Sequence, residues 1–452
     1  MNYVEKLIEE YSSLTYSIKT YGCQMNVNDS MKIQAVMQEC GFHYVDSVYS
    51  SNIAILNTCC VRENAENKVH GLVGNIKKLK SEGINRALIV MGCMMQQDGY
   101  AEEFMAMHSQ VDAALGTSDS TKLPEVLYNI LKEQKKIKAL DNATKEIDEE
   151  SISLRQYRVS EFVTIMTGCD NFCTYCIVPY VRGRERSRKP DDIIAEINDL
   201  LSHGTKEIVL LGQNVNSYGA GLGEDIDFSD LIWKITNETD VKRIRYMTSH
   251  PKDLSPKLID TIARNPVVCK HIHLPMQAGS SAILKKMNRR YDKEKYLQLV
   301  ADLKNAVPDI LLSTDIIVGF PGETEEDFRD TLDVVEQVEY SSAFMFKYSI
   351  RSGTKAADME NQVDEKIKSK RLQELISMQE IYTKKTAERF IGKVVEVLVE
   401  SDDTQGRNAI GKTSQNLPVA LQNDEKIELG AIINVEIREI KSHTLIGTIY
   451  RK

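Results

Sequence analysis

The sequence predicts an α/β protein built from an N-terminal parallel-sheet α/β domain, a central partial (βα)6 barrel and a small C-terminal all-β barrel. Three observations predict this order. Strand-like runs ending in cysteine alternate with helical patterns at the N-terminus, six further strand-like runs alternate with amphipathic segments in the centre, and short strands broken by Asp, Gly and Asn follow. We expect domains over 14–132, 155–386 and 387–452, with a linker over 133–154.

Composition narrows the class of protein. With 452 residues and 42% hydrophobic content, the chain is long enough for two or three cores. A net charge of −9 argues against a protein that coats nucleic acid over its whole surface, but it allows a local basic groove. The sequence has no secretory pattern and no run of about 18 apolar residues, so we expect a cytoplasmic protein without membrane contact. Disulfides rarely persist there, so the nine cysteines indicate metal binding or catalysis.

A helix is expected over about residues 2–13. Three segments after it share one sequence pattern. YSIKTYGC, IAILNTC and ALIVMGC are apolar runs that end at Cys23, Cys59 and Cys93, and a helical pattern follows each of them. The carboxyl ends of parallel strands form one ligand-binding edge, so we expect the three thiols to meet there. Three thiolates would hold a metal cluster with one open iron.

The alternative for these cysteines is an ordinary place in the core, where cysteine is common. Three cysteines at equivalent strand ends favour the metal cluster. Cys60 neighbours Cys59, and on an extended chain their side chains would point in opposite directions, so we expect one of the two at the edge. We expect Cys40 and Cys269 to be structural.

A second cysteine motif follows the first strand of the central domain. The run GCDNFCTYCIVPYVRGRERSR contains Cys169, Cys173 and Cys176 in a Cys-x-x-x-Cys-x-x-Cys spacing, which is compact enough to hold one inorganic cluster. A bacterial ferredoxin run uses another spacing, and a cubane cluster normally takes four protein ligands, so three cysteines leave one iron open. A zinc loop with a distant fourth ligand or a redox thiol set are the alternatives.

Three polar motifs follow later central strands: GQNVNSYG after the second, HLPMQAGS after the fourth and TDIIVGFPGETEEDF after the fifth. Because barrel chemistry lies on loops at the carboxyl face, we expect Gln213, Gln277 and Asp315 to hydrogen-bond a cofactor or substrate. A turn or cap role is the alternative for each. His271 and His273 alternate on a strand, and we interpret both as core histidines.

The C-terminal region begins with a long helical pattern from Asp364 to Thr386. Five short alternating runs follow, and they predict a five-stranded barrel: KVVEVLVE, NAIGKT, LPVA, AIINVEIR and TLIGTIY. This region resembles the TRAM domain, an RNA-binding appendage of tRNA-modifying enzymes. Its charges are nearly balanced, so a stabilising module is the alternative.

The two cysteine triads, the three-part order and the motifs TYGCQMN, NTCCVREN and HLPMQAGS resemble the methylthiotransferase family of radical S-adenosylmethionine (SAM) enzymes over nearly the whole chain. Ala278 departs from the serine expected in the Gln-x-Gly-Ser turn. The resemblance implies SAM and two 4Fe-4S clusters as cofactors. The cluster on the central triad would generate a 5'-deoxyadenosyl radical from SAM, and the cluster on the N-terminal triad would carry the donated sulfur, methylated from a second SAM. The candidates for cofactor binding are Tyr175, Gln213, Gln277 and Asp315.

The resemblance also implies a substrate. It is the tRNA anticodon loop with an isopentenylated adenosine at position 37, which leaves its stack and receives a methylthio group at carbon 2. Arg182, Arg184, Arg186 and Arg188 would contact phosphates, and a solvated charged loop is the alternative. We expect a monomer with an electron donor such as a flavodoxin or ferredoxin. The competing substrates are threonylcarbamoyladenosine in tRNA and an aspartate of a ribosomal protein, and a non-enzymatic iron–sulfur RNA-binding protein is the competing class.

Overall fold

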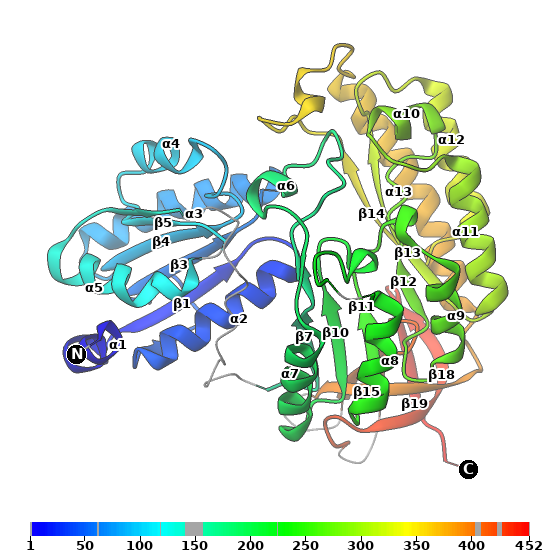
Figure 1. The fold of residues 1–452 in the computed structure, drawn as a ribbon, viewed down its shortest axis with the longest axis horizontal. Helices are drawn as coiled ribbons and strands as arrows, with labels where there is room; N and C mark the ends of the chain where they lie inside the picture. The colour runs from blue at the N-terminus through cyan, green and yellow to red at the C-terminus, as the bar shows by residue number, and fades with distance from the viewer. Residues whose placement is uncertain are drawn as a thin grey trace. The chain divides into compact units, whose positions relative to one another are not determined.

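The structure is a computed structural model that describes residues 2–60, 63–117, 119–140, 157–223, 225–402, 408–422 and 427–451. The chain divides into two compact units (Figure 1). The N-terminal unit comprises Met1–Gln156, Thr167–Asp170 and Cys176–Arg184. The barrel unit comprises Tyr157–Met166, Asn171–Tyr175 and Glu185–Lys452.

The N-terminal unit is built on a six-stranded sheet in the order β2-β1-β3-β4-β5-β6, and all neighbouring strands are parallel. The predicted linker begins at residue 133, but its described part adds an edge strand to this sheet, because the alternating run IKA pairs with β5. Residues 141–154 of that linker lie outside the described residues. The strands are β1 Thr15–Thr20, β2 His43–Tyr44, β3 Ile53–Thr58, β4 Ala87–Gly92, β5 Ala113–Leu115 and β6 Ile137–Ala139.

Helices cover both faces of this sheet, because its strands are apolar on both faces. Ile53 and Ile55 pack with residues of α1, α2 and α5, whereas Ala54 and Leu56 pack with residues of α3 and α4. Such burial of both faces is the usual state of an all-parallel sheet. The helices are α1 Tyr3–Tyr11, α2 Gln24–Glu39, α3 Glu63–Ser81, α4 Tyr100–Met107, η1 Ser120–Lys122 and α5 Leu123–Glu133.

The barrel unit contains all six predicted strands. They form two parallel three-stranded sheets in the orders β11-β10-β7 and β12-β13-β14, and one parallel bridge between Ile244 and Val268 joins β11 to the segment before β12. The predicted partial (βα)6 architecture is therefore confirmed. The strands are β7 Ser160–Thr164, β10 Glu207–Leu211, β11 Arg243–Tyr246, β12 His271–His273, β13 Leu311–Val318 and β14 Ser342–Lys347, with a two-stranded ribbon of β8 Met166–Thr167 and β9 Arg186–Ser187.

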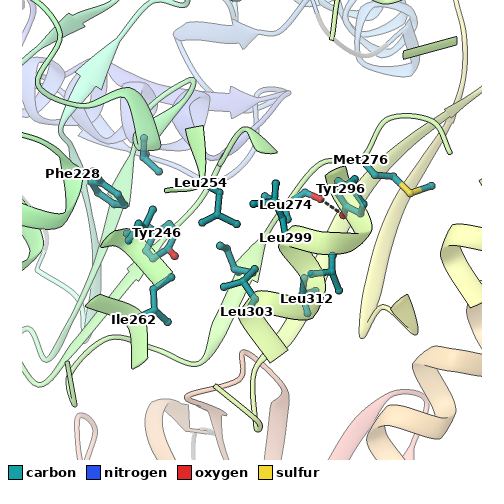
Figure 2. Packing of buried hydrophobic residues seen from close by; sticks show 14 of the residues in the cluster. Phe228, Tyr246, Leu254, Ile262, Leu274, Met276, Tyr296, Leu299, Leu303 and Leu312 are labelled. Atoms are coloured by element: carbon teal, nitrogen blue, oxygen red, sulfur yellow. Dashed lines mark hydrogen bonds between the residues drawn. The ribbon is translucent and has the colours of Figure 1, made fainter. Parts of the chain in front are cut away.

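One large apolar core joins these strands to the helices between them. In Figure 2, Phe228 of α8 meets Tyr246 of β11 edge to face, with ring centroids 5.2 Å apart. The Tyr296 hydroxyl donates to the Leu274 carbonyl at 2.9 Å, so this buried phenol is satisfied. The helices are α7 Pro190–Ser202, η2 Val215–Ser217, α8 Phe228–Glu238, η3 Pro251–Asp253, α9 Pro256–Arg264, α10 Ser281–Lys286, α11 Lys293–Ala306, α12 Glu325–Val338, η4 Lys355–Asp358 and α13 Glu365–Glu388.

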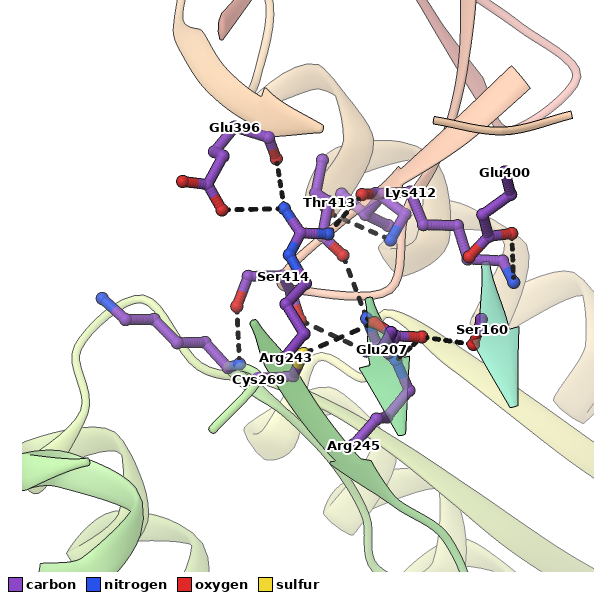
Figure 3. A network of polar contacts seen from close by, with 12 residues as sticks. Ser160, Glu207, Arg243, Arg245, Cys269, Glu396, Glu400, Lys412, Thr413 and Ser414 are labelled. Atoms are coloured by element: carbon purple, nitrogen blue, oxygen red, sulfur yellow. Dashed lines mark hydrogen bonds and ion pairs between the residues drawn. The ribbon is translucent and has the colours of Figure 1, made fainter. Parts of the chain in front are cut away.

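The C-terminal strands close into a five-stranded barrel in the order β15-β16-β17-β19-β18, as predicted. Arg243, the first residue of β11, donates to the Lys412 carbonyl at 2.8 Å, and Arg245 donates to the Thr413 carbonyl at 3.2 Å (Figure 3). The small barrel therefore docks on the amino edge of the central strands, opposite the edge with the polar motifs. Its strands are β15 Val394–Asp402, β16 Asn408–Thr413, β17 Pro418–Gln422, β18 Ile432–Lys441 and β19 Thr444–Ile449. Among the described helices, none has the length and apolar character to cross a membrane.

Candidate functional site

The N-terminal unit brings the first three predicted cysteines to one edge of its sheet. Cys23 follows β1, Cys59 follows β3 and Cys93 follows β4, and these strands are neighbours in the order β1-β3-β4. A hydrogen bond from the Cys59 thiol outweighs burial and lowers the pKa of Cys23 to about 6. Cys93 is buried and lies close enough to Cys23 to feel its charge. We call this edge the cysteine rim.

Cys60 also lies at the cysteine rim, contrary to the expectation that only one of the two adjacent cysteines would. A hydrogen bond with Cys93, together with burial, raises the pKa of the Cys60 thiol. The expectation assumed an extended chain, in which consecutive side chains alternate. The strand β3 ends at Thr58, and Cys60 stands in a bend. A residue beyond the strand end does not follow that alternation.

A buried arginine contacts the same rim. Arg182 ends the short helix α6 Val178–Val181, and its side chain is only 8% exposed. Its Nε donates to the Cys93 sulfur at 3.2 Å, and its Nη2 donates to the Asp29 carboxylate at 2.8 Å. Burial opposes the charge of this guanidinium, but Cys93 and Asp29 outweigh burial and raise the pKa of Arg182. The arginine is thus a fixed positive charge beside the thiols.

The donor set at the rim is chemically suited to an iron–sulfur cluster. Within the described ranges, no three His, Cys, Asp or Glu residues are placed to hold one ion together. A cubane cluster needs a wider set, because each thiolate binds its own iron. Soft thiolates beside a buried cation fit an anionic iron–sulfur cluster.

The central triad is divided between the two units. Cys169 and Cys176 belong to the N-terminal unit, whereas Cys173 belongs to the barrel unit. The Cys169 amide donates to the Gly183 carbonyl at 3.1 Å, which closes the loop on itself. Convergence of these three sulfurs on one cluster therefore stays a prediction from their spacing.

Within the barrel unit, Cys173 has a buried arginine of its own. The Arg289 Nη1 donates to the Cys173 sulfur at 3.3 Å, and its other nitrogens donate to the Pro275 carbonyl at 3.2 Å and the Tyr291 hydroxyl at 3.0 Å. No sequence pattern points to Arg289, because its contact with Cys173 spans 116 positions. Its neighbour Asn288 has a positive φ of 60°, and the Asn288 side-chain amide donates to the Phe172 carbonyl of the cysteine loop at 3.0 Å.

The predicted cofactor contacts all lie in the barrel unit. Gln213 follows β10, and its Oε1 is buried without a hydrogen-bond partner among the described residues, which makes it available to a ligand. Gln277 follows β12, is also buried, has a φ of 65° and forms a parallel bridge with Ile316 of β13. Tyr175 packs edge to face on Phe320, with ring centroids 6.4 Å apart. Their binding roles stay predictions.

Asp315 lies inside a strand and not in the loop that follows it. The strand β13 runs from Leu311 to Val318, so part of the predicted loop motif is strand. The Asp315 carboxylate pairs with His273 Nε2 at 3.3 Å, and His273 Nδ1 is 2.9 Å from the Ser313 hydroxyl. Asp315 therefore already has a protein partner. His271 is buried as well, and burial holds its pKa well below the ordinary range.

The arginine run divides into buried and exposed members. Arg182 and Arg188 are buried, and Arg188 donates to the Thr164 carbonyl at 2.6 Å and the Glu196 carboxylate at 2.7 Å. Both side chains have partners inside the protein, so the predicted phosphate role loses its basis for these two. The correction follows from local structure, since only Arg186–Ser187 form a strand here. Arg184 is 68% exposed and pairs with Asp170 at 2.9 Å. The phosphate role stays a prediction for Arg184 and Arg186.

Comparison with known proteins finds a family match for each of the three parts of the chain. Residues 163–335 match the radical SAM superfamily, residues 15–116 match the uncharacterized protein family UPF0004, and residues 388–450 match the TRAM domain. The chain is 47% identical to the tRNA-2-methylthio-N(6)-dimethylallyladenosine synthase of Acetivibrio thermocellus, over 100% of this chain and 94% of that protein. It is 49% identical to the synthase of the same name from Clostridium perfringens, over 96% and 97% of the two chains.

The fold is also similar to that of a solved structure. The radical S-adenosylmethionine methyltransferase TsrM from Kitasatospora setae, solved with cobalamin and a [4Fe-4S] cluster, superposes with a TM-score of 0.55 at 14% identity. The match covers 76% of this chain and 77% of that one. At this identity the likeness concerns the fold alone.

Proposed function

The chain belongs to the radical SAM tRNA methylthiotransferases, and from this premise we propose that it converts N6-(dimethylallyl)adenosine at position 37 of tRNA to its 2-methylthio derivative. Full-length identity of 47% to a synthase named for this product is the observation that carries the proposal. The family implies SAM and a 4Fe-4S cluster, and the substrate class is tRNA.

The proposal assigns a cluster to each cysteine triad. When bound, the cluster on Cys169, Cys173 and Cys176 would supply the electron for reductive cleavage of SAM. The second cluster, held by Cys23, Cys59 and Cys93, would supply the sulfur, and a second SAM would supply its methyl group. The gathering of three thiols at one sheet edge, beside a buried arginine, supports this second assignment.

The chain's own residues hold and shield this chemistry. Gln213, Gln277, Asp315 and Tyr175 bind SAM in the proposal, and the buried Oε1 of Gln213 supports a ligand contact there. A primary carbon radical attacks nearby C–H bonds, so the site that forms it must shield it from side reactions. Arg184 and Arg186 contact the anticodon loop through phosphates.

The proposal also includes partners. The enzyme acts as a monomer on the isopentenylated adenosine of the anticodon loop and receives electrons from a flavodoxin or ferredoxin. A single-stranded loop lets the adenosine leave its stack at a cost of a few kcal/mol.

A variant with Cys23, Cys59 and Cys93 all changed to Ala tests the division of labour. SAM cleavage needs only the central triad, so the reduced variant should still form 5'-deoxyadenosine while it makes no methylthiolated nucleoside. Anaerobic assays followed by mass spectrometry measure both products. Methylthio product at the parent level would contradict the assignment of the sulfur.

Nucleosides from a deletion strain test the substrate. We expect loss of 2-methylthio-N6-(dimethylallyl)adenosine with accumulation of its unthiolated precursor. Loss of a methylthiolated threonylcarbamoyladenosine, or of a methylthio group from a ribosomal-protein aspartate, would assign the chain to the corresponding alternative. Unchanged nucleosides and ribosomal proteins would indicate the non-enzymatic alternative.

A further inference from the structure

Arg182 lies at the cysteine rim although its neighbours in the sequence belong to the central motif. The segment Cys176–Arg184 is part of the N-terminal unit. Ile177 and Val181 of this segment form a small buried apolar cluster with Cys60 and Cys93. The Thr117 hydroxyl also donates to the Val181 carbonyl at 3.4 Å. The segment that carries one central-triad cysteine therefore packs directly on the rim.

The Arg182 side chain is held at both ends of its guanidinium. Its Nε donates to the Cys93 sulfur at 3.2 Å and its Nη2 to the Asp29 carboxylate at 2.8 Å. The arginine is 8% exposed and Asp29 is 22% exposed. The backbone amide of Arg182 is bound too, donating to the Val178 carbonyl at 2.8 Å. These contacts leave the guanidinium one position, against the rim.

The charged groups around Arg182 lie on α2 and at the end of β4. Asp29 lies in the first part of α2, whereas Cys93 follows β4 and Cys23 precedes α2, and all three act on the guanidinium. An ordinary ion pair between a guanidinium and a carboxylate would require only the contact with Asp29. The N–H directed at sulfur is the feature that an ordinary ion pair does not explain.

We propose that Arg182 is a positioning residue for the cluster of the N-terminal triad, held by Asp29 so that it donates an N–H···S hydrogen bond to Cys93. This inference rests on the proposed function. Hydrogen bonds to ligand sulfurs and nearby positive charge set the potential of an iron–sulfur cluster, because they stabilise its more negative, reduced state. Loss of Arg182 should therefore make that cluster harder to reduce.

The test uses the full chain with Cys169, Cys173 and Cys176 changed to Ala, so that only the N-terminal cluster contributes a signal. Iron content and the reduction midpoint, followed by electron paramagnetic resonance, are measured with and without Arg182→Gln. We expect iron to stay at about four per chain. The reduction equilibrium should move about tenfold toward the oxidised cluster, which is about 59 mV for one electron.

Matched variants separate the contact from general effects. Arg182→Lys keeps the charge but not the fixed N–H geometry of the guanidinium. Its reduction midpoint should therefore lie between that of the chain with Arg182 and that of Arg182→Gln. Arg86→Gln removes a charge at the amino end of β4, the opposite edge of the same sheet, and should not shift the midpoint. Asp29→Asn removes the carboxylate that holds the guanidinium in place. The electron paramagnetic resonance signal of the N-terminal cluster should therefore broaden.

Three outcomes distinguish the presence of the second cluster from the positioning role of Arg182. No iron in the triple-alanine chain would overturn the second cluster of the proposed function itself. Four irons with an Arg182→Gln midpoint equal to that of Arg86→Gln would overturn only the role of Arg182. If Arg182→Gln fails to retain the cluster while the chain stays folded by circular dichroism, and Arg182→Lys restores iron, the positioning role is supported by retention.

Discussion

At the scale of single residues, the buried pair of Glu207 and Arg245 shows how a charge is tolerated in the core. Their side chains are 2% and 4% exposed and lie 3.0 Å apart, and the Ser160 hydroxyl donates to Glu207 at 2.9 Å (Figure 3). Burial alone would raise the pKa of Glu207, but Arg245 outweighs burial and holds the pKa below its ordinary value of 4.5. The carboxylate is therefore charged in the folded protein.

Glu207→Gln should lower the free energy of unfolding by about 3–5 kcal/mol at pH 7, because Arg245 is left buried without a counter-charge. The folded-state pKa is the lower one, so the stabilisation is present above the ordinary pKa and is lost as pH falls through the folded-state value. Urea denaturation between pH 3 and pH 7 should show the difference between parent and variant shrinking toward acid. Glu238→Gln, which breaks a surface pair with Lys234, is the control and should leave stability nearly unchanged. A pH-independent difference would contradict the assigned charge state.

The exposed and buried arginines of the central motif should respond differently to the same substitution. Arg184→Ala should flatten the dependence of log affinity for tRNA on log salt by about 0.7, the value for one phosphate contact in single strands. Arg188→Ala should instead lower stability, because Glu196 and the Thr164 carbonyl lose their buried partner. Salt titrations of binding and thermal unfolding of both variants measure this contrast. Parent-like salt slopes for both Arg184→Ala and Arg186→Ala would remove the phosphate assignment.

At the scale of elements, glycines shape the ends of the strands that present cysteine. Gly92 closes β4 with φ of 103°, and a Cβ there would meet the Thr58 carbonyl oxygen of β3 at 2.5 Å. Gly168 precedes Cys169 with φ of 79°, and a Cβ there would overlap the Arg184 carbonyl. A side chain at either position would displace the cysteine that follows.

Gly92→Ala should therefore weaken iron binding at the N-terminal triad and lower stability, since strain at a positive φ adds to a clash with backbone. The control is Gly71→Ala in α3, where a Cβ has open space and helical backbone. That control should stabilise the chain by roughly 0.5–1 kcal/mol. Iron analysis and thermal unfolding of both variants measure these differences in iron content and stability. Equal iron content in the two would show that the Gly92 turn does not position Cys93.

At the scale of the whole molecule, the two triads predict two independent clusters. Anaerobically reconstituted protein should hold about eight irons, and the variant with Cys169, Cys173 and Cys176 changed to Ala should hold about four. The reason is that each triad has its own spacing and neither completes a four-ligand set. Iron and sulfide analysis measures this. A folded variant without any iron would contradict an independent second cluster on the N-terminal triad.

Much of the fold follows from the sequence because its signals are local. Apolar runs that alternate with amphipathic helices specify the parallel sheets, and a cysteine at the end of each of three apolar runs specifies one edge. The spacing of Cys169, Cys173 and Cys176 needs no tertiary information, because all three lie within eight residues. The five C-terminal strands were likewise predictable from short alternating runs.

Only the tertiary structure decided which charged side chains are buried and which are exposed. Arg182 and Arg184 look equivalent in the sequence, but one donates to Cys93 and Asp29 while the other is exposed. Arg289 contacts Cys173 across 116 positions of sequence. Burial and pairing depend on distant segments that meet in space, and hydrophobic period, spacing and composition contain no information about those meetings. The sequence therefore determined the elements and the candidate cluster thiols, whereas packing determined their polar partners.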